Sequence, residues 1–513
     1  MKAIGFKNFR KFIDFPEMDF APITMLVGGN NSGKSTTVKA IVSVFTFLRN
    51  ARLESKGNIN NQILYNNFYF NQNPYVHIGT FKRAKCNKTE SNDLFFQITF
   101  EDLNFYLWLN GDGADDNTTY AHLTRFKIED TENRSSFDYD FDKNNVTVSF
   151  ETNVDLFESK PGYIDLLKKI TEYETKVTNG DNYAVRYLER YKRQLRDKYP
   201  VVKSPFTLMA KITDVALHRM IGGPFISGLI YNTCYYFMDK EESLDNINQS
   251  YESSKISDVQ NYIFSLSHRL ETLFYMYPLI EYIYAHAASQ IVLYNSIDNN
   301  YLSRTIHEFA NFRKDKDLQA FGFVEHWMKF FEIGKSFELK SIGGEAHTFD
   351  IHDFDDKLTP LADKGMGTIQ LIILLLRIAI IINDRSVNGK MRKVPTTIII
   401  EEPEQNLHPK KQSQLIEFFK QIYDDYGIRF IIETHSEYLI RRSQVMVAES
   451  KYESDEQLKK ECPFKVYYYP ENGLPYDMEY QTNGRFARDF ESGFFDEAFK
   501  SAILLSKIER GRV

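Results

Sequence analysis

A glycine-rich loop, residues 28–35 with the sequence GGNNSGKS, constrains the fold of this chain more than any other feature. The residues before it, 23–27, form an apolar run that predicts a short buried strand. From Thr36 to Arg49, apolar residues recur on one helical face, which predicts an amphipathic helix. A strand, a glycine loop and a helix in this order place backbone N–H groups and a helix N-terminus around phosphate. The loop therefore predicts a nucleotide-binding site.

This loop supplies most of the candidate nucleotide-binding residues, which are Gly28, Asn30, Asn31, Ser32, Gly33, Lys34, Ser35 and Thr36. Lys34 is expected to reach the outer phosphates and to act in catalysis, and the Ser35 hydroxyl is expected to ligate Mg²⁺. At ordinary residue frequencies, a chance match to this pattern in a chain of this length has odds of about one in a hundred. Nucleotide binding is the better explanation.

Two further strand ends carry residues suited to phosphate chemistry. The β-branched run 396–400 ends in Glu401 and Glu402, which are expected to hold Mg²⁺ and to polarise the attacking water, respectively. A second apolar run, 428–432, is followed by His435, which is expected to sense the γ-phosphate. An acidic pair after a strand is commonly only its solvated end. Three such ends nevertheless predict one shared site.

Together these motifs resemble the ABC-type ATPase heads of SMC proteins and, more closely, bacterial ATPases related to the overcoming-lysogenization-defect (OLD) group. The matching segments are residues 28–35 for Walker A, 401–409 (EEPEQNLHP) for Walker B and the D-loop, 434–436 (THS) for the switch, and 8–12 (NFRKF) for the opening strand. The resemblance implies ATP and Mg²⁺ as cofactors and adds Arg10 to the nucleotide-binding residues. It also implies that Gly365 and Gly367, in the signature position 361–370, approach the γ-phosphate of a partner copy.

Some residues depart from the family pattern. Asp363 and Lys364 replace polar residues of the transporter signature, and Glu401 stands where transporters and SMC heads carry Asp, although Glu also offers oxygen ligands to Mg²⁺. The two glycines of this segment could equally form a helix-capping turn. No glutamine has a context that identifies the Q-loop.

The resemblance and the chain pattern together predict an α/β fold, an ABC-type P-loop ATPase head with a mixed central sheet, an antiparallel β-lobe and a helical insertion. We expect four parts: an ATPase lobe with a β-meander (1–155), a helical insertion (156–335), a second ATPase lobe (336–450) and a small appendage (451–513). Helices are expected over 163–199, with a turn at 179–182, and over 256–312. The function of the insertion is open.

Composition and charge limit the classes of partner and the cellular compartment expected for this chain. A net charge of −7 does not favour indiscriminate nucleic-acid binding, although a local nucleic-acid contact is compatible with it. Three scattered cysteines suit a reducing cytoplasm rather than a disulfide framework. The longest apolar run, 369–382, contains Gln370 and Arg377 and is too short to span a bilayer, so we expect a buried helix and no membrane.

The functional prediction is an ATPase whose copies associate through ATP and separate on hydrolysis at Glu402. The leading hypothesis is a sensor or regulator in bacterial antiphage defence that acts on a separately encoded effector such as a nuclease. The alternatives are a DNA-repair or DNA-clamping SMC-like ATPase, an OLD-type nuclease and a transporter subunit. The nuclease is disfavoured because fewer than eighty residues follow His435. The missing arm disfavours the DNA clamp, and the signature disfavours the transporter.

Overall fold

The computed structural model covers residues 1–513 and describes all of them except 53, 57–62, 66, 74–75, 77, 151–160, 199–205, 217–224, 240–252, 277–279, 286–289, 296–299, 313–317, 388–389, 392–395, 492–493 and 510–513. The chain forms two compact units. One contains residue 1, 19–42 and 277–513, and the other contains 2–18 and 43–276. These two units do not divide at the expected boundaries after residues 155, 335 and 450. Those boundaries stay predictions.

The first unit is built on a six-stranded sheet in which four neighbouring pairs run parallel. Its strands, in spatial order, are β13 (Ile280–Ile283), β20 (Thr396–Glu401), β21 (Ile428–Thr434), β3 (Ile23–Gly28), β22 (Phe464–Tyr469) and β23 (Tyr476–Asp477). Every residue of β3 is buried, as expected for a central strand covered on both faces. Parallel alignment brings the carboxyl ends of β20, β21 and β3 to one edge of the sheet, as predicted.

Helices accompany this sheet, and a small antiparallel sheet completes the unit. The helices are α9 (Tyr301–Ala310), α10 (Leu318–Phe330), α11 (Met366–Arg385), α12 (Pro409–Tyr426), α13 (Glu437–Glu449), α14 (Asp455–Glu461) and α15 (Glu497–Glu509). The small sheet contains β14 (Tyr294–Asn295), β15 (Ser336–Ile342), β16 (Ala346–His352) and β17 (Leu358–Pro360). α11 is long and apolar enough to cross a membrane, but 78% of its apolar window is buried within the structure. It packs against α9 and α10 as a core helix.

The prediction of helix over the whole of residues 256–312 is wrong in its middle. Ile280–Ile283 forms β13, which pairs in parallel with β20 from Thr397 to Ile400. A short apolar run does not by its periodicity distinguish strand from helix, and here pairing with a neighbouring strand decided the outcome. Helix is present on either side, in α8 (Ser253–Glu271) and α9.

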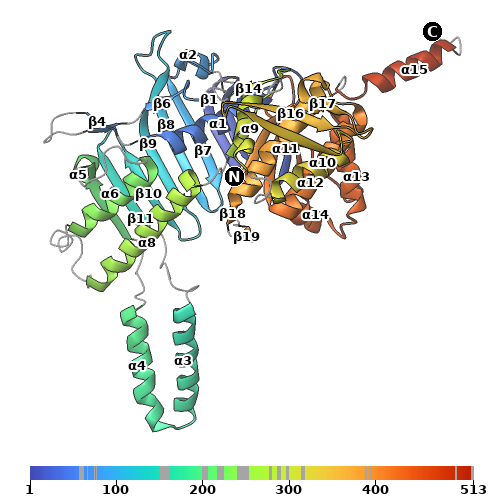
Figure 1. Cartoon of the computed structure of the whole chain (residues 1–513). Coiled ribbons are helices and arrows are strands. Elements are labelled where there is room, and N and C mark those ends of the chain that lie inside the picture. The colour runs from blue at the N-terminus through green and yellow to red at the C-terminus, as the bar shows by residue number, and fades with distance from the viewer. Residues whose placement is uncertain are drawn as a thin grey trace. The chain divides into compact units, whose positions relative to one another are not determined.

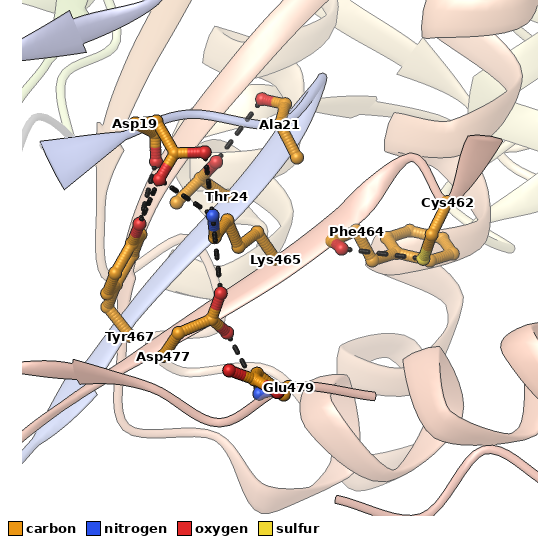
Figure 2. A network of polar contacts seen from close by, with 9 residues as sticks. All are labelled: Asp19, Ala21, Thr24, Cys462, Phe464, Lys465, Tyr467, Asp477 and Glu479. Atoms are coloured by element: carbon orange, nitrogen blue, oxygen red, sulfur yellow. Dashed lines mark hydrogen bonds and ion pairs between the residues drawn. The ribbon is translucent and has the colours of Figure 1, made fainter. Parts of the chain in front are cut away.

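A polar cluster joins the C-terminal strands to Asp19, which precedes β3 in the chain (Figure 2). Lys465 on β22 binds the carboxylate of Asp19 at 2.7 Å and that of Asp477 on β23 at 3.2 Å. The Tyr467 hydroxyl donates to Asp19 at 2.7 Å. Burial alone would raise the pKa of Asp19, but the hydrogen bonds from Lys465 and Tyr467 outweigh it and lower that pKa. The C-terminal strands are therefore part of the nucleotide-site sheet.

The second unit contains a nine-stranded antiparallel sheet, which confirms the predicted β-lobe. Its strands are β12 (Phe206–Lys211), β11 (Asn145–Phe150), β10 (Ser135–Asp140), β9 (Tyr120–Asp130), β8 (Leu103–Asn110), β7 (Asp93–Phe100), β1 (Ala3–Phe9) and β2 (Phe12–Asp19), with β6 (Asn67–Tyr69) paired to β9. Buried and partly exposed residues alternate along β7 and β8, so one face of these strands is covered and the other is more open to solvent.

The helices of the second unit include the predicted hairpin. α3 (Pro161–Thr178) and α4 (Asn182–Lys198) lie side by side and are joined by a turn at residues 179–181 (Figure 1). Helices α5 (Ile212–Ala216), α6 (Phe225–Asp239) and α8, which is followed directly by a π-helical segment (Thr272–Met276), are further described helices of this unit.

Candidate functional site

The phosphate-binding loop joins the end of β3 to α1 (Lys34–Asn50), as the sequence predicts. Gly28 has φ 153°, and a Cβ atom at this position would lie 2.4 Å from the carbonyl oxygen of Tyr469 on β22. Only glycine lets the two strands approach this closely. Tyr469 is fully buried, and its hydroxyl donates to Thr37 Oγ1 at 2.9 Å. Strand β22 thus fixes both the entry to the loop and the start of the helix.

The polar residues of the loop differ in their exposure to solvent. Asn30 and Asn31 are exposed, and Asn31 has φ 59°. Ser32 and Thr36 are buried, and the Ser32 hydroxyl has no hydrogen-bond partner among the described residues. Lys34 is 3% exposed, and its ammonium donates to the carbonyl oxygens of Gly28 and Gly29 at 3.0 and 2.9 Å. The Lys34 side chain therefore folds back onto the phosphate-binding loop.

Strand β20 ends with the two candidate carboxylates. Glu401 accepts a hydrogen bond from the backbone N–H of Ala285 at 3.3 Å. Glu402 has φ 46°, an uncommon conformation for a residue other than glycine, and its N–H donates to the Glu433 carbonyl at 2.8 Å. Gln405 donates to the Glu402 carboxylate at 3.0 Å. The two adjacent side chains are thus held by different neighbours, as two separate tasks would require.

The switch residue follows β21 and is positioned through its backbone. The N–H of His435 donates to the carboxylate of Glu404 at 2.7 Å. Burial, and then the positive charge of Lys34, lower the pKa of His435, while Glu402 opposes them. Burial also raises the pKa of Glu404, which belongs to the D-loop that follows β20. The D-loop thereby fixes the position of the switch.

Glu433 is the residue that sequence reasoning missed. Its carboxylate accepts a hydrogen bond from Ser35 at 2.8 Å and lies 3.9 Å from the Lys34 ammonium. It is 5% exposed, and its Oε2 has no hydrogen-bond partner in the described part of the chain. Burial and the nearby Glu401 raise the pKa of Glu433 to about 7, against the opposing effects of Ser35 and Lys34. Its place at the end of an apolar strand, beside His435, was the available signal.

These residues fit a divalent cation. A hydroxyl and acidic oxygens are the ligands that Mg²⁺ takes in phosphate-binding sites, where phosphate and water complete the set. The orphaned buried oxygen of Glu433 and the repulsion from Glu401 are what a cation would relieve. The described residues contain no group of three or more His, Cys, Asp or Glu side chains suited to a metal ion.

The two signature glycines have different surroundings. Gly367 lies in the first turn of α11, and a Cβ there would lie 2.4 Å from the Asn406 carbonyl oxygen of the D-loop. Its close backbone approach is therefore to its own chain. Gly365 is exposed, has no atom near its missing Cβ, and caps α11 by accepting from the Thr368 N–H at 2.9 Å. This segment therefore forms a capping turn, and the expected approach of the two glycines to a partner's γ-phosphate stays a prediction.

Arg10 belongs to the second unit. It has φ 51°, and its N–H donates to the Ala84 carbonyl at 2.7 Å. Burial, and then Arg83, lower its pKa. Its expected contact with nucleotide stays a prediction.

A phosphate loop, paired glutamates and a switch histidine on adjacent parallel strands define a P-loop ATPase. The chain belongs to the AAA ATPase domain family, whose model matches residues 1–440. It therefore binds and hydrolyses ATP. No curated protein matches it at a significant level.

Several solved structures of SMC head domains are similar to the chain. A Pyrococcus furiosus Smc head domain with an extended coiled coil, bound to the C-terminal domain of ScpA, is 10% identical, with a TM-score of 0.33 and 99% of each chain covered. The SMC head domain from Thermotoga maritima is 9% identical, with a TM-score of 0.35 and coverage of 93% of this chain and 98% of that one. A Pyrococcus yayanosii Smc head domain with a coiled coil and joint is 11% identical, with a TM-score of 0.36 and coverage of 94% and 97%.

Proposed function

We propose that ATP joins copies of this protein through their nucleotide sites and that hydrolysis separates them. The supporting observation is the contrast between the two faces involved. Lys34, Ser35 and Glu433 gather on one face, where three strands end. Gly365 is exposed at the start of α11 and leaves its backbone open to another molecule. A partner's triphosphate bridging the two faces would make ATP part of the interface.

In this proposal each residue has a separate task. Lys34 and the loop N–H groups neutralise the phosphates, and Ser35 with Glu401 would hold Mg²⁺, which supplies charge stabilisation when bound. Glu402 would orient the attacking water and accept its proton. His435 would donate to the γ-phosphate, and its lowered pKa favours the neutral, orientable imidazole. Glu433 would release Ser35 and turn toward the cation's shell when nucleotide enters.

We further propose that this cycle regulates a separately encoded effector, with a nuclease as the first candidate, in bacterial antiphage defence in the cytoplasm. The support is the resemblance of the motifs at 28–35, 401–409 and 434–436 to ATPases of such systems. The antiparallel sheet and the helical hairpin lie outside the nucleotide-site strands and offer surfaces for the effector and its trigger.

Replacing Glu402 by Gln tests the association cycle. We expect ATP binding to persist, turnover to fall by about a hundredfold or more because general-base assistance is lost, and larger species to accumulate with ATP and Mg²⁺. ATPase assays and size-exclusion chromatography with light scattering measure both effects. Glu417→Gln is the matched control, since that carboxylate binds Arg442 on the neighbouring helix. Unchanged turnover would remove Glu402 from its proposed role.

A second experiment addresses the effector. The product of each neighbouring gene is co-expressed with the wild-type protein or with Glu402→Gln, and phage plaquing is counted. Loss of protection in the variant would support regulation by hydrolysis. If an adjacent permease gene alone were required, the proposal would give way to transport.

A further inference from the structure

The α3–α4 hairpin carries a concentration of basic charge in an acidic protein. Residues 161–198 contain nine Lys and Arg against six Asp and Glu, a net charge of +3, whereas the whole chain has −7. The two helices are joined by a turn in which Gly180 has φ 90° and Asp181 accepts from the Tyr183 N–H at 2.9 Å, capping α4. The cap places Tyr183 at the first turn of α4, next to the hairpin tip.

Contacts between the two helices bury some side chains and leave others partly or fully exposed. Ala184 and Leu188 of α4 and Ile170 of α3 are buried. Tyr173 of α3 packs against Tyr187 and Tyr191 of α4, with ring centroids 5.7 and 5.3 Å apart. The hairpin is therefore held together by its own apolar and aromatic seam.

Two lysines of the hairpin form ion pairs within it. Lys176 binds Glu172 at 2.6 Å and lies 4.5 Å from the ring centroid of Tyr173. Lys192 binds Glu174 of the other helix at 2.9 Å. These ammonium groups contribute to the hairpin's own cohesion.

Three arginines of α4 stand in contrast. Arg186, Arg190 and Arg193 are exposed, and within the described residues none of them has an ion pair or hydrogen bond. Their spacing of four and three residues puts them on one helical face over roughly 10 Å of axis. Glu189 is an acidic residue near this face.

Tyr183 lies on the same face as the arginines, and Tyr187, which also packs against Tyr173 of α3, lies at the edge of that face with part of its ring exposed. Tyr183 and Tyr187, three residues before and one residue after Arg186, are 86% and 47% exposed. An exposed tyrosine ring gives a flat surface on which any base can stack, and a guanidinium binds phosphate in a planar, bidentate manner. Three guanidinium groups in one row offer successive contacts to the phosphates of a single strand, whose flexible backbone can follow them.

We propose that the face formed by Tyr183, Arg186, Tyr187, Arg190 and Arg193, named here the arginine stripe, binds single-stranded nucleic acid. Guanidinium groups contact successive phosphates, and the two tyrosines stack on unpaired bases. Single strands are favoured over duplex because their bases are free to reach the rings. This site is separate from the nucleotide site and does not depend on the proposed association cycle.

The test is fluorescence anisotropy of labelled oligonucleotides of about 20 nucleotides, oligo-dT and oligo-rU, with the full-length protein and without ATP. We expect binding at low salt, with log K falling against log salt with a slope of about −2 for three phosphate contacts on a single strand. The triple variant R186Q/R190Q/R193Q should bind at least tenfold more weakly and lose most of this slope. Tyr183→Ala should lose affinity about fivefold or more with little change of slope.

The double variant K176Q/K192Q is the matched control, because it removes basic charge that is already paired. It should retain most of the wild-type affinity and slope. Circular dichroism and ATPase activity verify that the variants are folded. The proposal is overturned if the wild type does not bind either oligonucleotide at 50 mM salt, if the triple variant binds like the wild type, or if duplex binds equally well. Binding of the stripe to anionic lipid vesicles but not to oligonucleotides would also overturn it.

Discussion

In the antiparallel sheet, Asp138 lies on a half-exposed strand face where Arg125 donates to its carboxylate at 2.8 Å. In the parallel sheet, Glu433 is buried at a strand end, and one of its oxygens has no partner among the described residues. Both oxygens of the Asp138 carboxylate are bound by Arg125, whereas Ser35 and Lys34 lie at only one oxygen of Glu433. A buried, incompletely paired acid costs stability and indicates that a ligand completes its environment. In these two sheets, the fully paired carboxylate of Asp138 is expected to be structural, and the incompletely paired carboxylate of Glu433 is expected to be functional.

The first prediction tests whether Glu433, unlike Asp138, contributes to ATP hydrolysis. Glu433→Gln should lower ATPase turnover by about 10- to 100-fold, because residues that orient metal ligands commonly contribute that much. Its melting temperature without nucleotide should be unchanged or higher, since the amide removes repulsion with Glu401. Steady-state ATPase assays at several Mg²⁺ concentrations and differential scanning fluorimetry measure these effects.

Asp138→Asn is the matched change in the antiparallel sheet. It should leave turnover unchanged and destabilise by about 0.2–1 kcal/mol, the usual range for a partly exposed ion pair. If both variants lost stability and neither lost activity, Glu433 would be another structural acid.

The second prediction compares the two signature glycines. Gly367→Ala should destabilise the protein by about 1–3 kcal/mol, because its methyl group would collide with the D-loop backbone at Asn406. Gly365→Ala meets open space, so the unfolding free energy should change by less than about 1 kcal/mol, while ATP-linked association weakens. Urea unfolding and light scattering with ATP separate the two effects. Equal destabilisation by both substitutions would contradict the assignment.

The sequence predicted those parts of the site that are contiguous in the chain. The loop at 28–35 and the helix after it follow from local residue types, and the apolar runs at 396–400 and 428–432 lie where expected. The task of Glu433 could not be read locally, since it depends on β21 pairing with β3, so that its side chain reaches Ser35. The contact of Gly367 with Asn406 and the pairing of β13 depend equally on tertiary packing.

The last prediction concerns Asp19, which tests whether pairing or membership of the parallel-sheet unit decides the behaviour of an acid. This carboxylate lies in the same unit as Glu433, yet Lys465 and Tyr467 bind it and lower its pKa (Figure 2). An acid with a lowered folded-state pKa stabilises above its unfolded pKa of about 4, and that contribution is lost as the pH falls through the folded-state value. Because the Asp19 side chain is 71% exposed, Asp19→Asn should cost only about 0.2–1 kcal/mol at pH 7 and less at pH 3. Urea unfolding of both proteins across this range measures the difference, and ATPase activity at pH 7 should be unchanged. If the cost were the same at both pH values, the ion pair with Lys465 would not stabilise the sheet edge. Ion pairing would then not explain why Asp19 and Glu433 differ.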